Sequence, residues 1–435
     1  MFDRYTSDLA KASLLLHTVK GDRDRLDLVL ELQRFLIRQI SRLERRLKRV
    51  GRAEENMRKR RSNDRPSRET ANKLKLSIEK CSSVKERLRQ QMFIWRCFGD
   101  GIAGAYQSKY SLKYLYFDRN SDIKESAGFL TGKSGFRLEW RLVKLGIQMN
   151  VPVVLSDITN VIRHGDVCAL AGADPLPIEA KSGKRLNARG IRQKADREEL
   201  HNYFENDGAP LFRGMINLRR FEMHAPEINH NAAANACIDQ SLSQVSATVE
   251  PEPGLRYVAI RSRDAEVVVQ SVLPYAGKFH AVYHLTPTLD WTPSYPFTLS
   301  LKPANLIDFV LGRVSFLVII DIRQIKTHFK ALGLHTTAQM DGNWAIQFCK
   351  DPDELAAGVF RITERGLAKV ATEFKSLEWF VREMAEALLR KPEDLTHLSK
   401  EELEALPGAG WETPQGWLQA RDLFDDSTSI DQGQA

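Results

Sequence analysis

The chain has 435 residues, of which 43% are hydrophobic and 28% charged, values that are ordinary for globular proteins. At about 150 residues per domain, we expect two to four domains. The longest apolar run, residues 309–322, contains Arg313 and Asp321, which excludes a membrane-spanning helix, and no signal peptide is recognisable. Five cysteines stand singly, which indicates reduced thiols. We therefore expect a cytoplasmic protein without membrane association.

The charge is distributed unevenly along the chain. Residues 1–100 hold 26 Lys and Arg against 14 Asp and Glu, a net charge of +12. The other 335 residues hold 38 basic and 42 acidic residues, a net charge of −4. Because neutralisation of phosphates drives sequence-independent binding of nucleic acids, a basic segment on a near-neutral body favours a polyanionic partner.

Two long amphipathic stripes occupy the first hundred residues. Apolar residues recur at spacings of three and four in both stripes, the first interrupted by Gln33 and the second by Lys85. Their members are Leu26, Val29, Leu36, Ile40, Leu43, Leu47 and Val50, then Leu74, Ile78, Cys81, Leu88, Met92 and Trp95. The pattern predicts an antiparallel helical hairpin, a coiled-coil arm within residues 1–118.

The connection between the stripes, residues 57–68, is basic and turn-prone, so the sequence predicts Arg58, Lys59, Arg60 and Arg61 at the tip of the hairpin. Two interpretations of the arm remain open at this point. It binds nucleic acid, or it is a packing element that forms a homodimer or recruits a protein partner.

A glycine-rich segment at residues 128–134 reads Gly-Phe-Leu-Thr-Gly-Lys-Ser. A phosphate-binding loop has four residues between its glycines and follows an apolar strand, whereas this segment has three and follows a polar stretch. We therefore do not expect nucleotide binding. The segment is expected to cap the helix that follows, or to contact a substrate phosphate through its amides.

Residues 151–204 carry the pattern that indicates chemistry. Short apolar runs flanked by Gly and Pro predict strands, and Asp166 and Glu179 lie thirteen residues apart on two of them. A hairpin would bring both carboxylates to one end of the sheet, and Lys181, two residues after Glu179, would share its face. Two carboxylates can hold Mg²⁺ or Mn²⁺ through oxygen. The metal would acidify a water, and Lys181 would orient or deprotonate that water.

This pattern resembles the PD-(D/E)xK nuclease superfamily, which has the restriction-endonuclease-like fold. Asp166 matches the first acid of the family motif and Glu179-Ala-Lys181 its acid–x–Lys triplet, while Gly165 stands where a proline is usual. The resemblance covers roughly residues 125–225. It implies that Asp166 and Glu179 are the metal ligands and that Lys181 is catalytic.

Two further positions match members of this superfamily. Glu139, on a predicted helix, corresponds to a helical glutamate near the metal, and Gln193 corresponds to a glutamine after the motif lysine. His164, two residues before Asp166, is a candidate for contact with the metal ligands. The same acid–x–Lys spacing recurs at Glu373 and Lys375, but on a predicted helix, where side chains two residues apart diverge.

The predicted organisation is a helical arm over residues 1–118, a nuclease core with a mixed sheet over 119–228, and a linker over 229–254. A C-terminal α/β domain follows over 255–390, including one long amphipathic helix across 367–388. Residues 391–435 form an acidic tail that we expect to be partly disordered.

The function predicted from these patterns is Mg²⁺-dependent hydrolysis of phosphodiester bonds, most readily in DNA, by an endonuclease or exodeoxyribonuclease. The resemblance implies restriction, antiviral genome defence or repair as settings. Two alternatives remain: a nuclease-like protein that only binds nucleic acid, and a coiled-coil scaffold or adaptor.

Overall fold

The computed structural model describes residues 5–64, 66–118, 127–180, 188–220, 226–261, 279–351 and 359–389. The chain forms two compact units. The first comprises residues 1–221 together with 287–311, and the second comprises residues 222–286 together with 312–435. Both contain helices and sheets, as predicted, and all strand pairs among the described residues are antiparallel. The mixed sheet predicted for the core is therefore not found among the described strands.

The first unit combines a helical arm, a small sheet and a β-hairpin. Its helices are α1 (Thr6–Gly21), α2 (Leu26–Asn63), α3 (Arg68–Tyr106), α4 (Lys109–Tyr116), α5 (Phe136–Gln148), α6 (Ala188–Glu205), α9 (Phe297–Ser300) and α10 (Pro303–Val310), with 3-10 turns η3 (Ser156–Ile158) and η5 (Leu289–Trp291). Its strands are β1 (Val153–Leu155), β2 (Val167–Ala169), β3 (Leu176–Ile178), β4 (Gly208–Phe212) and β5 (Met215–Arg219). Strands β1, β2 and β3 form one sheet in that order, and β4 pairs with β5.

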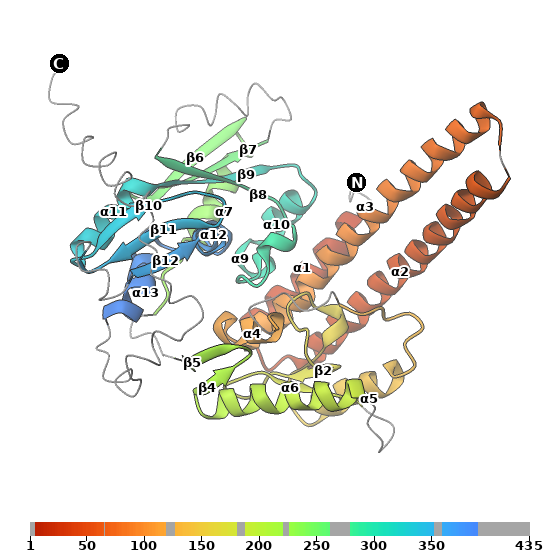
Figure 1. Cartoon of the computed structure of the whole chain (residues 1–435), viewed down its shortest axis with the longest axis horizontal. Helices are drawn as coiled ribbons and strands as arrows, with labels where there is room; N and C mark the ends of the chain where they lie inside the picture. The colour runs from red at the N-terminus through yellow and green to blue at the C-terminus, as the bar shows by residue number, and fades with distance from the viewer. Residues whose placement is uncertain are drawn as a thin grey trace. The chain divides into compact units, whose positions relative to one another are not determined.

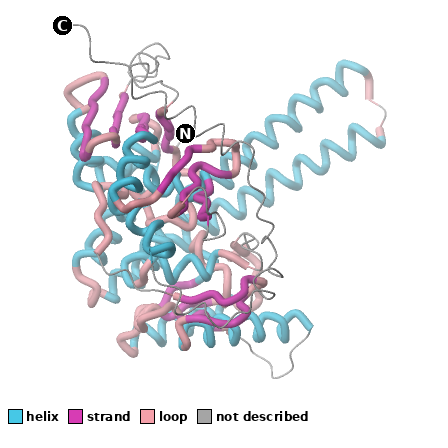
Figure 2. The backbone as a smooth tube through the Cα atoms, turned by 60° about the vertical axis from the view of Figure 1, so that its left-hand side comes forward, coloured by secondary structure: helices cyan, strands magenta, loops and turns pink. Residues whose placement is uncertain are grey.

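The predicted helical hairpin is present, and α2 and α3 run side by side in both ribbon views (Figure 1, Figure 2). Most of the apolar stripe of α2 is buried, and on α3 Trp95 packs edge-on against Phe35 and against Tyr5 beside α1. Toward the tip, Glu54 takes a buried position and pairs with Arg58 and Lys85. The arm thus has an apolar base and a charged outer half.

Gln33, which interrupts the apolar stripe of α2, is buried and bonded to the sheet. Its Nε2 donates to the carbonyl of Val153 over 2.8 Å, and its Oε1 accepts from the amide of Leu155 over 3.0 Å. Strand β1 pairs with β2 on its other side, so the glutamine amide satisfies backbone groups along its outer edge. This polar residue therefore joins the arm to the sheet that carries the candidate site.

The second unit is built on a four-stranded sheet of order β6-β7-β9-β8 and a three-stranded sheet of order β10-β11-β12. Val258, Ile260, Leu317 and Ile319 form a buried core cluster. The elements are α7 (Asn231–Gln240), β6 (Ser246–Glu252), β7 (Leu255–Ile260), β8 (His280–Leu285), β9 (Ser315–Asp321), α11 (Ile322–Ala331), β10 (His335–Ala338), β11 (Trp344–Cys349), β12 (Val359–Thr363), α12 (Glu364–Thr372) and α13 (Leu377–Leu389).

Two predictions about domain boundaries are wrong. Residues 229–254 are not a linker, because they contain helix α7 and strand β6, which pack together in the second unit. Residues 287–311, predicted within the C-terminal domain, belong to the first unit. There Thr298 donates its hydroxyl to the carbonyl of Cys97 in α3, and Lys20 donates to the carbonyl of Leu299.

The single long helix predicted across residues 367–388 is also wrong, because α12 ends at Thr372 and α13 begins at Leu377. Between them Phe374 has a left-handed φ of 49°, and its ring packs edge-on against Tyr257 and Phe316. Lys375 is buried, with Nζ 2.7 Å from Glu383 and 3.4 Å from Glu373. The helix is thus interrupted where the Phe374 ring and the Lys375 ion pairs are buried. Apolar periodicity does not reveal this interruption.

The predicted acidic tail, residues 391–435, lies outside the described residues. No helix in the described ranges combines the length and the apolar character needed to span a bilayer.

Replacement of Gln33 by Leu is expected to lower the stability of the first unit by about 2 kcal/mol. The substitution keeps the apolar seam but leaves a buried amide and a buried carbonyl of β1 without partners. Thermal unfolding followed by circular dichroism measures the effect. Gln39→Leu, on the same helix and half-buried, is the control. An equal loss in both variants would contradict the role given to Gln33.

Candidate functional site

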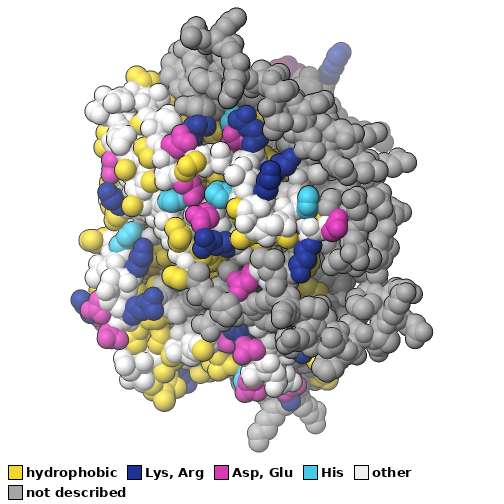
Figure 3. Space-filling view, turned by 90° about the vertical axis from the view of Figure 1, so that its left-hand side faces the viewer, with side chains coloured by type: hydrophobic (Ala, Val, Ile, Leu, Met, Phe, Trp, Pro, Cys, Tyr) yellow, Lys and Arg dark blue, Asp and Glu magenta, His cyan; other side chains and the backbone are white. Residues whose placement is uncertain are grey.

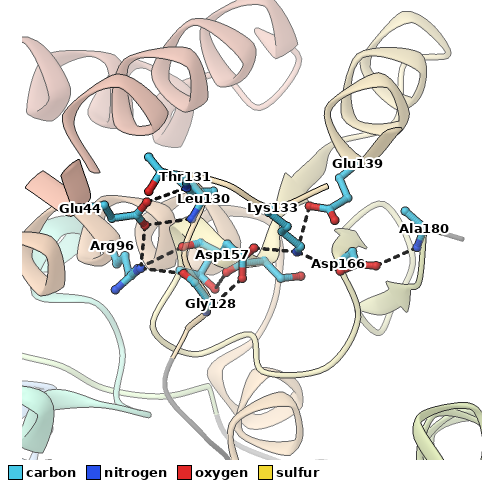
Figure 4. A network of polar contacts seen from close by, with 12 residues as sticks. Glu44, Arg96, Gly128, Leu130, Thr131, Lys133, Glu139, Asp157, Asp166 and Ala180 are labelled. Atoms are coloured by element: carbon cyan, nitrogen blue, oxygen red, sulfur yellow. Dashed lines mark hydrogen bonds and ion pairs between the residues drawn. The ribbon is translucent and has the colours of Figure 1, made fainter. Parts of the chain in front are cut away.

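Three carboxylates converge on one ammonium group at the edge of the small sheet (Figure 4). Lys133 Nζ lies 2.8 Å from Asp157 Oδ2, 3.0 Å from Glu139 Oε2 and 3.1 Å from Asp166 Oδ1. Glu139 comes from the first turn of α5, Asp157 from η3 directly after β1, and Asp166 from the residue before β2. Four segments that are separate in the sequence therefore contribute to one polar cluster, which we call the Lys133 cluster.

The turn that carries Asp166 depends on Gly165. Its φ is +75°, and a Cβ atom there would approach the backbone nitrogen of Ile178 to 2.8 Å. Proline, which is usual at this place in the nuclease superfamily that the motif resembles, has φ locked near −65° and is incompatible with this backbone. The glycine lets β3 approach closely, and the Asp166 amide donates to the Ile178 carbonyl over 2.9 Å.

The predicted hairpin between Asp166 and Glu179 is confirmed. Strands β2 and β3 pair antiparallel with Val167 opposite Ile178, and the Ala180 amide donates to Asp166 Oδ2 over 3.0 Å. Glu179 itself forms an ion pair with Arg197 of α6, with 3.3 Å between Oε1 and Nη1. The segment carrying the acid–x–Lys triplet thus begins beside Asp166, and Arg197 holds the carboxylate of Glu179.

The loop that carries Lys133 is anchored by helix α2. Glu44 of α2, fully buried, accepts the amide of Leu130 over 2.9 Å and that of Thr131 over 2.8 Å. Lys48, one turn later, donates to the carbonyl of Thr131 over 2.7 Å. The sequence suggested that amides of this loop contact a substrate phosphate. In the structure, these two amides donate to the carboxylate of Glu44 instead.

The charges in the Lys133 cluster do not balance. Burial raises the pKa of the Glu139 carboxyl, the hydrogen bond from Lys133 opposes that rise, and the nearby Asp166 and Asp157 charges add to it. Although burial opposes it, hydrogen bonding to Asp157 and the surrounding negative charge raise the pKa of Lys133. One ammonium group faces three carboxyl groups, so the formal charge of the cluster itself is negative, while Arg96 and Arg163 also act electrostatically on Asp157.

The remaining predicted site residues fall outside this cluster or outside the described side chains. Lys181 lies outside the described residues, and Gln193 lies on α6 with its side chain not described. His164 is buried, with Nε2 3.3 Å from the Phe117 carbonyl and 3.3 Å from Arg213 Nη2. Through Arg213, these contacts connect His164 to the turn between β4 and β5.

Sequence reasoning missed two members of the Lys133 cluster. Asp157 lies two residues after the buried strand β1. An acid at the end of a buried strand is a sequence signal that could have identified it as a site residue. The sequence pattern places Lys133 only in an imperfect phosphate-binding loop. Its role follows from the position that Glu44 gives to the loop, which no local pattern reveals.

The donor set, three carboxylates, suits a hard cation such as Mg²⁺. Within the described part of the chain, however, no three or more Asp, Glu, His or Cys side chains are grouped as ligands of a metal ion. The Lys133 ammonium stands where the oxygens converge (Figure 4). The three carboxylates are suited to a cation, and in this structure the cation between them is the Lys133 ammonium group.

Comparison of the chain with models of protein families, with curated proteins and with solved structures gives no match. The assignment of function therefore rests on the geometry and chemistry of the site.

Lys133→Met is expected to destabilise the first unit by about 2 kcal/mol at pH 7, because three partly buried carboxylates lose their counter-ion. Burial raises the pKa of the Glu139 carboxyl, and the variant loses the Lys133 hydrogen bond that opposes this rise, so the penalty is present at neutral pH. It is relieved as the pH falls through the raised pKa of Glu139 and this carboxyl takes up a proton. Urea unfolding at pH 7 and pH 4.5 measures the difference.

Lys194→Met, which removes an exposed pair with Glu198, serves as the control and should change little at either pH. A Lys133→Met variant as stable as the wild type at pH 7 would show that the carboxylates do not depend on this ammonium group.

Proposed function

We propose that this chain is a metal-dependent nuclease that hydrolyses phosphodiester bonds in DNA. The observation that supports this most is the convergence of Glu139, Asp157 and Asp166 on one point. The segment bearing Glu179 and, by sequence, Lys181 begins alongside, joined to Asp166 through the Ala180 amide. Restriction, genome defence and repair are the settings that fit this chemistry.

In this proposal Asp157 and Asp166, with Glu139 beside them, would hold the cation. They replace the predicted ligand pair of Asp166 and Glu179, because the Glu179 carboxylate pairs with Arg197. Bound Mg²⁺ or Mn²⁺ would supply an acidified water and neutralise charge that develops on the phosphate. Asp166 is fixed by the Ala180 amide, so it can present its other oxygen without reorganising. Lys181 would add positive charge and orient the water. Lys133 would have to leave the carboxylates for the cation to bind, because two cations repel each other at one position.

A second candidate function is a nuclease-like protein that binds nucleic acid without cleaving it. The observation that favours it is the Lys133 ammonium itself, which already bridges all three carboxylates. In such a protein Lys133 is a permanent structural counter-ion, and the cluster takes up no divalent cation. The two functions therefore predict opposite results for metal binding.

Asp166→Asn and Asp157→Asn are each expected to lower the rate of plasmid cleavage in Mg²⁺ by about 100-fold or more, since each removes a ligand charge. Agarose-gel assays of supercoiled DNA at varied Mg²⁺ and Mn²⁺ measure the rate. Asp24→Asn, an exposed substitution of the same kind between α1 and α2, is the control. Full cleavage by either cluster variant would contradict the assignment.

A further inference from the structure

A continuous row of arginines runs along one face of helix α2. Spacings of three and four residues bring side chains to the same face of a helix, and all members of the row are exposed. We call this row the arginine stripe, and its members are Arg34, Arg38, Arg42, Arg45, Arg49 and Arg52. At 1.5 Å per residue it extends over roughly 27 Å.

The members of the stripe have no acidic partners within the described residues. Other basic residues of the arm pair with an acid one turn away, as Arg58 does with Glu54 and Lys73 with Glu69. No ion pair joins an arginine of the stripe to any described acid. Like charges at this spacing destabilise a helix by about 0.2–0.5 kcal/mol per pair, so the row carries a standing repulsion that a polyanion would relieve.

The arm concentrates the positive charge of the whole protein. Residues 42–89 hold 18 Lys and Arg against 7 Asp and Glu, a net charge of +11, whereas the full chain has +8. On the face drawn in Figure 3, by contrast, dark-blue basic and magenta acidic side chains are interspersed. The excess positive charge is therefore a property of the arm.

The arm offers little apolar surface to a protein or a membrane. Among the described residues 42–90, Leu76 is the only large hydrophobic side chain classed as exposed, because α2 and α3 bury their apolar stripes against each other. Dimerisation of coiled coils and insertion into lipid both require an exposed apolar face. Charge, with no such face, is the signature of binding to a phosphate backbone.

We propose that the arginine stripe binds the sugar-phosphate backbone of duplex nucleic acid. The inference rests on the proposed function in one respect, that the bound duplex is the substrate of the Lys133 cluster. The length of the arginine stripe corresponds to about eight base pairs at 3.4 Å each. Arg45 and Arg49 directly follow Glu44 and Lys48, which hold the loop of Lys133, so the stripe lies on the helix that anchors this loop.

The test is the affinity of the full chain for a fluorescein-labelled 24-base-pair duplex, measured by anisotropy in EDTA so that no cleavage occurs. The test variant is Arg42→Gln/Arg45→Gln/Arg49→Gln, which removes repulsion from α2 and should fold at least as well. The matched control is Arg25→Gln/Arg256→Gln/Arg382→Gln, which loses the same charge from arginines that form ion pairs.

The stripe variant should bind about tenfold or more weakly at 0.15 M salt. The slope of log Kd against log salt should fall by about 2.7, which corresponds to three phosphate contacts. The control should stay within about twofold of the wild type. Equal weakening of both variants, or of neither, would overturn the proposal. DNA and RNA duplexes are run in parallel to identify the preferred backbone.

Anionic vesicles of phosphatidylserine and phosphatidylcholine form a further arm of the experiment. Loss of vesicle binding in the stripe variant, with duplex affinity unchanged, would also overturn the proposal. Plasmid cleavage in Mg²⁺ separates the two hypotheses. If the wild type binds duplex through the stripe but does not cleave plasmid DNA, this inference stands and the nuclease assignment is contradicted. If the stripe variant keeps full duplex affinity, only this inference is contradicted.

Discussion

The contact on which the rest of the site depends is that of the Lys133 ammonium with three carboxylates. Each carboxylate, from Glu139, Asp157 and Asp166, lies within 3.1 Å of the Lys133 nitrogen, and without a cation between them the three would repel one another. Their convergence draws together α5, the end of β1 and the start of β2. Because Glu44 holds the lysine loop, this one ion cluster also links the sheet to the helical arm. The charge that the ammonium leaves uncompensated is what makes the site a candidate for a divalent cation.

The polar residues within helix α2 explain how the arm and the sheet become one unit. Gln33 bonds the edge of β1 and Glu44 bonds the lysine loop, each at a buried position. An apolar residue at either place would leave backbone groups unsatisfied. The same helix presents its arginine stripe on another face. A nucleic acid bound there would lie against the helix that positions the loop, and this helix would connect the arm physically to the proposed site.

Much of the local structure was predictable from the sequence. Apolar periodicity identified the helical hairpin, and the thirteen-residue separation of Asp166 and Glu179 identified the β2–β3 hairpin. The sequence patterns did not predict that Asp157 and Lys133 belong to the cluster, because long-range packing decides the positions of these residues. It also joined α12 and α13 across Phe374, where a buried ring and the Lys375 ion pairs accompany a left-handed residue. The polar, alanine-rich composition of 229–254 suggested a linker, although tertiary contacts make it a helix and a strand.

The central claim is that the carboxylates of the Lys133 cluster hold a divalent cation. Isothermal titration of Mn²⁺ into the full chain and into its Glu139→Gln variant tests it most directly. A single binding event in the wild type, weakened severalfold or more in the variant, is the predicted result. Identical binding curves for the two proteins, or no binding of Mn²⁺ by the wild type, would contradict it.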